Sequence, residues 1–250
     1  MIARIASIVG LGMFSMLVSA ENVKPLTLMA VKIPGLYDTD NPGPYNAVFE
    51  RLMVGSSYNY VLREAPLRRA TTAFIKGNAD CYFFGTNDKS IYQEQGVPKR
   101  DLLISDPVNP ISLKIYTRAG ETVINEASEL QGLFIAVDQG ATEISRAAEH
   151  LSVSPEYLLP AQTLSQAFRL LNQKRVDAVM AFDSDVRIYQ GNSSDASHYG
   201  VSDTLSLIVS HDSVVCRRSD VTEQFISHIN EQLSSLKKSG DLDRILNGPN

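Results

Sequence analysis

Cysteine, histidine and basic residues are all scarce in this sequence. It has two cysteines and four histidines, and the histidines are scattered without i, i+4 spacing or a cysteine partner. Zinc chemistry is therefore not indicated, and we expect no metal and no cofactor. Lys and Arg number 23 against 28 Asp and Glu, which leaves a formal net charge of −5. We expect no nucleic-acid partner, because the chain lacks the basic surface that such binding requires.

The N-terminus carries the pattern of a cleavable signal peptide. Arg4 precedes an apolar run at residues 5–18, and small residues at 18–20 offer a cleavage point. The run is short for a membrane span, and a permanent anchor is the alternative. Export would place Cys81 and Cys216 in an oxidising compartment, where a disulfide persists. The sequence leaves open whether they form a disulfide or stay as two unpaired core cysteines.

One stretch of the chain occurs twice. Residues 70–84 and residues 167–181 both read as an amphipathic helix, a polar turn, an aspartate and an apolar strand, so that Asp80 corresponds to Asp177. Two copies about a hundred residues apart predict two similar α/β lobes. The alternative is that any α/β protein contains such units.

The first predicted strand, at residues 26–31, leads into a loop at 32–44 that is rich in turn-forming residues. Ligands of open α/β sheets bind outside the carboxyl ends of the strands, so this loop is a candidate cleft wall. Tyr37 within it is either a ligand platform or a packing residue. Further strands are predicted at residues 58–63, 79–85, 102–104, 111–118 and 134–137.

The chain is predicted to cross between the lobes twice. Pro107 and Pro110 stiffen the first passage, before the strand at 111–118. Residues 205–209 and 214–217 read as a pair of extended segments, the second being the return hinge. The C-terminal residues 223–246 have apolar residues at helical spacing and predict core-facing helix.

Two segments could meet an anion. Arg68 and Arg69 lie in the first turn of a helix that follows Pro66, where they oppose the helix dipole, so they face an anion or are solvated surface charges. The strand at 134–137 is followed by Gly140, Ala141 and Thr142 at the start of a helix. This arrangement is an anion cradle or a plain helix cap.

Several short motifs, in this order, carry a resemblance to a known family. They are Arg69-Ala70, Gly77-Asn78-Ala79-Asp80, Ser105-Asp106-Pro107, Leu130-Gln131-Gly132, Gly140-Ala141-Thr142, Arg175-Val176-Asp177-Ala178 and Leu236-Lys237-Lys238-Ser239-Gly240. With the signal peptide, they resemble the type II periplasmic solute-binding proteins, in the amino-acid-binding branch of family 3. The resemblance covers essentially the whole mature chain.

The resemblance implies an α/β protein of two lobes, each a mixed sheet flanked by helices, joined by two hinge strands. Residues 21–109 and 213–250 would form lobe 1, and residues 110–212 lobe 2. Such a protein is a periplasmic monomer that closes on a small-molecule ligand and delivers it to the membrane permease of an ABC transporter. Thr86, in the loop after the third strand, and the Gly140-Ala141-Thr142 turn would help to bind the carboxylate of an amino acid.

The sequence departs from the family pattern at two ligand positions. The arginine position holds Pro98, with Arg100 two residues further on, and the aspartate position holds Phe182, with Asp183 next. A shift of two residues can be absorbed in a loop, whereas a shift of one at a strand end turns the side chain to the opposite face. Arg100 or Arg69 is the expected carboxylate partner, and Asp183 is the candidate for the ammonium group.

Two other functions fit the same fold. One is a ligand-sensing subunit that docks on a membrane receptor. The other is a lyase that resembles cyclohexadienyl dehydratase, with Glu64, Asp88 or Asp183 as its acid/base group. No serine lies in the glycine pattern of a nucleophile elbow, and no catalytic constellation is evident. The sequence therefore favours a binding protein over an enzyme.

Overall fold

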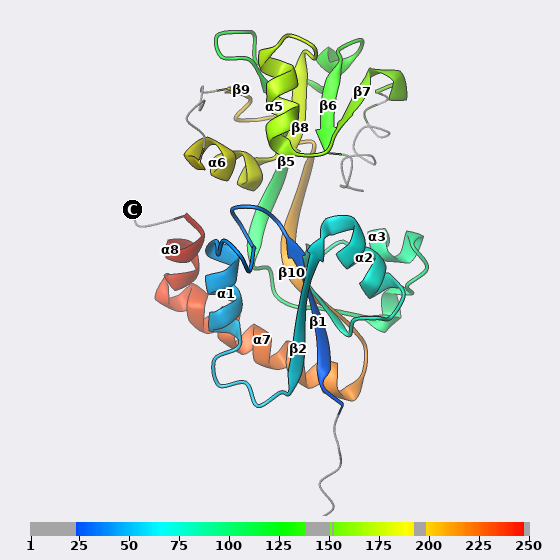
Figure 1. Cartoon of the computed structure of the whole chain (residues 1–250), viewed down its shortest axis with the longest axis vertical. Coiled ribbons are helices and arrows are strands. Elements are labelled where there is room, and N and C mark those ends of the chain that lie inside the picture. Colours follow the sequence, from blue (N-terminus) through cyan, green and yellow to red (C-terminus); the bar gives the residue numbers. More distant parts are fainter. Residues whose placement is uncertain (1–23, 139–150, 152, 193–198, 248–250) are drawn as a thin grey trace, which may run out of the picture.

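The computed structural model describes residues 24–138, 151, 153–192 and 199–247. Figure 1 shows two lobes stacked along the long axis of the molecule, with strands β5 (Asn109–Thr117) and β10 (Ile208–Arg217) running between them. The strands follow the order β2-β1-β3-β10-β5-β8-β6-β7, and β4 and β9 pair at the sides. The hydrogen-bonded ladder is continuous across the lobes because β10 pairs with both β3 and β5. The predicted two-lobed α/β fold is confirmed.

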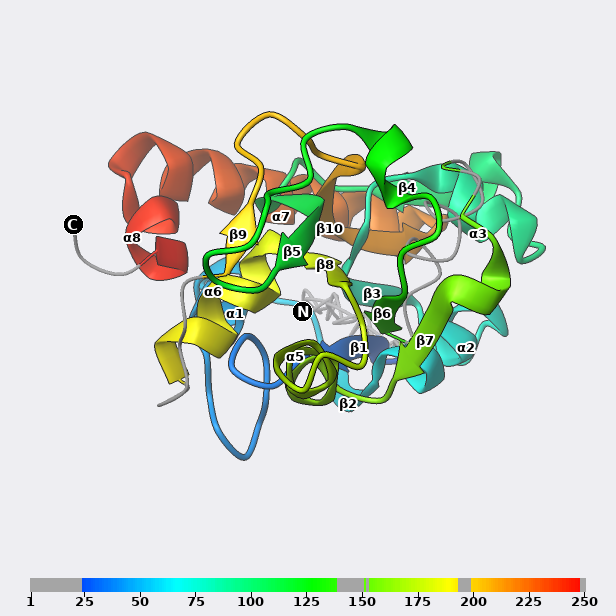
Figure 2. The ribbon, with the colours of Figure 1, turned by 90° about the horizontal axis from the view of Figure 1, so that it is seen from above.

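Lobe 1 is built on β1, which lies between two parallel neighbours. Its side chains alternate: Leu28 and Ala30 enter the core under α1, α7 and α8, whereas Met29 and Val31 enter the core under α2 and α3. Figure 2 shows α8 and α1 on one side of these strands and α2 and α3 on the other. The elements of lobe 1 are β1 (Leu26–Lys32), α1 (Pro44–Leu52), β2 (Tyr60–Pro66), α2 (Leu67–Ile75), β3 (Cys81–Thr86), α3 (Lys89–Glu94), η1 (Lys99–Asp101), β4 (Leu102–Ile104), α7 (Asp220–Ser239) and α8 (Asp241–Asn247).

Lobe 2 repeats this plan with β6 between two parallel partners. One face of its sheet is covered by α5 and α6, over a core that includes the ring of Phe168. The opposite face carries a second core around Leu130 and Met180. The remaining elements are η2 (Ala127–Leu130), β6 (Ile135–Asp138), η3 (Pro155–Tyr157), β7 (Leu158–Ala161), α5 (Leu164–Asn172), β8 (Ala178–Phe182), α6 (Asp183–Asn192) and β9 (Gly200–Val201).

The predicted sequence repeat is a structural repeat. Asp80 donates its N–H to the carbonyl of Thr27 (2.8 Å) and accepts the N–H of Thr27 on its carboxylate (2.7 Å). Asp177 makes the same pair of bonds to Phe134, at 2.7 Å and 2.9 Å. In both lobes the aspartate therefore fastens the start of one strand to its parallel neighbour. The two copies are equivalent in hydrogen bonding as well as in sequence.

The two extended segments predicted near the return hinge are parts of one strand, so their prediction as a pair is wrong. A single strand, β10, pairs with β5 from Ile208 to Asp212 and with β3 from Asp212 onward, with an irregular register between Ser213 and Val214. The polar residues between the two apolar runs resemble a turn in the sequence. They lie instead where the strand passes between the lobes, and there Ser210 bonds to the Thr86 hydroxyl (2.9 Å).

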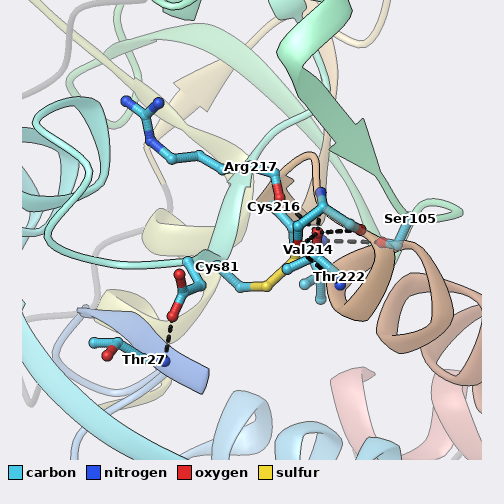
Figure 3. Close-up of a disulfide and its surroundings, with 9 residues drawn as sticks. Thr27, Cys81, Ser105, Val214, Cys216, Arg217 and Thr222 are labelled. Carbon is cyan, nitrogen blue, oxygen red and sulfur yellow. Dashed lines mark hydrogen bonds between the residues drawn. A yellow bond between two sulfur atoms is a disulfide. The ribbon is translucent and has the colours of Figure 1, made fainter. Parts of the chain in front are cut away.

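Cys81 and Cys216 form a disulfide, which settles the alternative that the sequence left open. They are register partners on β3 and β10, and both side chains are fully buried. Figure 3 shows the bond beside the end of β10, where the N–H of Val214 donates to the Ser105 hydroxyl (2.9 Å). The disulfide fastens the returning strand to the lobe 1 sheet.

The helical C-terminus is confirmed. α7 buries Phe225, Ile229, Leu233 and Leu236 against the lobe 1 core, and it ends at Gly240, whose φ of 73° is left-handed. Among the described residues no helix combines the length and the apolarity that crossing a membrane requires. The predicted signal peptide lies outside the described residues.

Candidate functional site

The carboxyl ends of β1 and β2 carry a cluster of charges around Lys32. Its Nζ lies 2.8 Å from Asp38, 2.9 Å from Asp40 and 3.2 Å from Glu64. Glu64 also accepts the N–H of Thr39 (2.7 Å), which holds the loop after β1 against β2. The hydrogen bonds to Asp38 and Asp40 raise the pKa of Lys32, and the bond from Lys32 lowers the pKa of Asp38. Three carboxylates around one ammonium make this edge of lobe 1 acidic.

A second polar group ties both hinge strands to lobe 1. The Tyr45 hydroxyl, on α1, donates to the carboxylate of Asp212 on β10 and accepts from Asn109 of β5 (2.8 Å). Burial, and then the charge of Asp212, raise the pKa of Tyr45 well above its usual value, so the phenol stays protonated. Close by, the N–H of Asn87 donates to the carbonyl of His211 (3.0 Å). These bonds fix the point at which the strands leave lobe 1.

Asp183 faces β5. Its Oδ1 accepts the N–H of Ser112 and the N–H of Ser184, both at 2.9 Å, while the preceding Phe182 packs into the lobe 2 core. The one-residue shift from the family pattern therefore places the carboxylate on another side of the strand end, as pleat geometry requires. α6 begins at Asp183, so Asp183 and Asp185 both lie in its first turn.

Tyr37 is a core residue and not an exposed ring. It is 1% exposed, and its ring packs against Phe49 and Phe84 with centroids 6.4 Å and 6.0 Å away. The reason is local, because an antiparallel bridge between Ile33 and Tyr37 turns the side chain inward. Burial raises the pKa of Tyr37 to about 12. The structure supports its interpretation as a packing residue.

The two arginines proposed as carboxylate partners lie far apart on lobe 1. Arg69 is exposed in the first turn of α2, directly after the carboxyl end of β2. The side chain of Arg100 is 87% exposed, and its carbonyl accepts from Arg218, next to Arg217 at the end of β10. That end of β10 pairs near Cys81, at the amino end of β3, whereas Thr86 is at the carboxyl end. The structure does not bring Arg100 together with Thr86.

The remaining predicted ligand residues divide into two groups. Thr86 lies at the carboxyl end of β3, 7% exposed, and its hydroxyl is bonded to the hinge strand. Gly140, Ala141 and Thr142 lie outside the described residues. The Lys32 cluster was missed, although its carboxylates all follow or end a predicted strand. The position of these carboxylates at the ends of predicted strands was the signal from which the cluster could have been predicted.

Solved structures of low sequence identity share this arrangement of lobes and hinge strands. The GluR0 ligand-binding core from Nostoc punctiforme, in complex with L-glutamate, matches with a TM-score of 0.71 at 18% identity, over 90% of this chain and 100% of that one. This chain has the type II periplasmic binding protein fold. The arginine-, lysine- and histidine-binding protein ArtJ from Geobacillus stearothermophilus shares this fold with a TM-score of 0.68. The match has 16% identity and covers 89% of this chain and 93% of that one.

Sensor proteins also share the type II binding-protein fold. A histidine kinase sensor domain matches with a TM-score of 0.68 and 15% identity, over 89% of this chain and 94% of that one. In sequence, the chain is 28% identical over 154 residues to a protein of Shewanella frigidimarina that is named as a sensor. That match covers 59% of this chain and 21% of the relative, so the chain spans about a fifth of the relative's length. No protein-family model matches the chain.

Proposed function

We propose that this protein captures a small polar ligand, an amino acid or a related carboxylate, between its two lobes. The observation that carries the proposal is the structural match, over 90% of the chain, with a ligand-binding core in complex with L-glutamate. Proteins of the same fold include the substrate-binding protein of an amino acid ABC transporter and ArtJ, which is named as binding arginine, lysine and histidine. Capture requires no catalytic group, and each carboxylate considered for a lyase already accepts hydrogen bonds: Glu64, Asp88 and Asp183.

Closure would occur about β5 and β10. We place the lobe boundaries at residues 21–109 with 213–250 and at 110–212, because β5 begins at Asn109 and β10 changes partner at Asp212. The ligand would favour the closed state by making contacts that only this state offers. The bonds of Tyr45 hold the lobe 1 ends of both strands, so bending would be concentrated beyond them.

The charges at the lobe 1 edge suggest how an amino acid would lie. Within the Lys32 cluster, Asp38, Asp40 and Glu64 outnumber the one ammonium, so this cluster favours an ammonium group over a carboxylate. Arg69 lies in the first turn of α2, which follows the carboxyl end of β2 directly, and we assign it to the carboxylate in preference to Arg100, which lies toward the amino end of β3.

The captured ligand would be reported or delivered at a membrane. Delivery to the permease of an ABC transporter is the role of one structural neighbour by its name. Sensing is favoured by a separate observation, the sequence match to a part of a longer protein named as a sensor. We therefore propose a periplasmic monomer whose partner is a membrane sensor or a permease.

A thermal-shift screen of the mature chain against amino acids and small carboxylates tests capture. A ligand that binds only the native protein raises the melting temperature, by an amount that grows with its concentration over Kd. We expect Arg69→Ala to abolish the shift. Arg100→Ala is the matched control, because it also removes an exposed arginine, but from the far end of the sheet. A shift that survives Arg69→Ala but not Arg100→Ala would reverse the assignment, and no shift with any compound would refute capture of this class.

A further inference from the structure

Lobe 2 contains a cavity that shares only Asp183 with the roles considered above. It has a volume of about 300 Å³ and lies between β5, β9 and α6. Its lining residues are Lys114, Tyr116, Asp183, Val186, Arg187, Gln190, Tyr199 and Val201. We refer to it as the β5–α6 cavity. All of these residues belong to lobe 2, and the volume is at the lower end of the range for small-molecule sites, roughly 300–1,000 Å³.

Two cations in the lining have donors to spare. Lys114 donates to the carbonyl of Ser202 (3.1 Å), and Arg187 donates to the side chain of Asn247 (3.2 Å). An ammonium has three donors and a guanidinium five, so most of them are not used by these two bonds. Within the described part of the chain, neither cation forms an ion pair.

The acidic member of the lining is already engaged. The Oδ1 of Asp183 accepts two backbone N–H groups, from Ser112 and Ser184. The lining holds one carboxylate and two cations, and the charge of Asp185, in the first turn of α6, also reaches Tyr116. An anion that entered it would meet donors on both sides.

The hydroxyl of Tyr116 is a further donor in the lining of the cavity. The residue is 5% exposed and lines the cavity, and its hydroxyl has no hydrogen-bond partner among the described residues. Burial, and then the charge of Asp183, raise the pKa of Tyr116, so the hydroxyl keeps its proton and remains a donor.

We propose that the β5–α6 cavity binds a small carboxylate, with Lys114 and Arg187 as its cationic partners and the Tyr116 hydroxyl as a hydrogen-bond donor. The site shares no residue with the lobe 1 groups assigned to capture, which are the Lys32 cluster and Arg69. It also has a route to lobe 1: Arg187 reaches Asn247 of α8, and the next residue, Ile188, packs against the lobe 1 core.

The test is a titration of the mature chain with sodium acetate and with sodium succinate, against sodium chloride at equal ionic strength. Ring-labelled tyrosines report binding by NMR, with Tyr116 assigned by Tyr116→Phe and Tyr199 as the reporter in that variant. We expect saturable shifts with a carboxylate and not with chloride. Lys114→Met and Tyr116→Phe should each weaken binding by about tenfold or more, since each removes a donor to a charged group.

Two control variants separate this site from others. Lys89 also donates to a backbone carbonyl, that of Leu102 at 3.0 Å, but lies in lobe 1, so Lys89→Met should leave the affinity unchanged. Arg69→Ala should leave it unchanged as well, even where it abolishes capture between the lobes. Linear shifts without saturation, or equal affinity in Tyr116→Phe, would overturn the proposal. Tyr116→Phe keeps the ring in the core, so it decides the matter if Lys114→Met fails to fold.

Discussion

Breaking the disulfide between Cys81 and Cys216 should destabilise lobe 1 strongly. The structure gives two values for the expected loss of free energy of unfolding, depending on whether lobe 2 unfolds as well. The cysteines are 135 residues apart, and the loop they close contains all of lobe 2. If both lobes unfold together, the entropy of closing a loop of this length corresponds to about 5 kcal/mol. If lobe 2 stays folded, its β5–β10 pairing already closes most of the loop. About 30 flexible residues then remain, and the expected loss is about 3.7 kcal/mol.

The assay is urea unfolding followed by far-UV circular dichroism, because the chain has no tryptophan. The oxidised protein is compared with the protein in a reducing buffer and with the double variant Cys81→Ala, Cys216→Ala. Reduction keeps both sulfur atoms in a core where the cysteines are fully buried, so it isolates the cross-link. The double variant adds the packing cost of two small cavities.

A loss of free energy of unfolding below about 1 kcal/mol on reduction would refute this reasoning, since loop closure predicts several times more. The double variant should show the same stability in oxidising and reducing buffers. A difference between the two buffers in that variant would mean that the reductant acts elsewhere, and the measured loss could not be assigned to the cross-link.

Three further predictions concern groups that the structure places in paired or buried positions. Asp80→Ala and Asp177→Ala should each lower the free energy of unfolding by about 1–3 kcal/mol in urea titrations, because each removes an acceptor of a charge-assisted bond; a negligible loss in either would contradict their equivalence. Tyr45→Phe should cost a similar amount in the same assay, since it leaves the carboxylate of Asp212 without this donor, and an unchanged midpoint would count against the hinge network. The folded-state pKa of Tyr37 is raised to about 12, so its contribution to stability is complete below pH about 10 and is lost as pH rises through 12. Urea titrations across that range should show a smaller alkaline loss in Tyr37→Phe, and identical pH profiles would refute the burial argument.

Local patterns predicted the repeat because its physics is local. A helix, a turn and an aspartate before a strand can be read from neighbouring residues, and Asp80 and Asp177 proved equivalent down to their hydrogen bonds. The face of Asp183 could also be anticipated, because a shift of one residue at a strand end changes the side that a side chain meets. The C-terminal helix showed its buried stripe at helical spacing.

The candidate site was predicted less well because its members come from distant parts of the chain. Tyr37 looks like a loop residue in the sequence, but a bridge at Ile33 turns it into the core. Arg100 is close in sequence to the family's arginine position. It lies in η1, however, where its carbonyl accepts from Arg218 near the amino end of β3. Loop length alone does not specify the end of a sheet to which a loop returns.

The sequence by itself determined the class of fold, the twin lobes and the main core positions, since periodicity and turn chemistry act over a few residues. The tertiary structure decided the pairing of Cys81 with Cys216, the continuity of β10 and the partners of Lys32. Each of these joins residues that only the strand order makes neighbours. A strand order is set by burying both faces of a sheet at once, and that is a property of the whole chain.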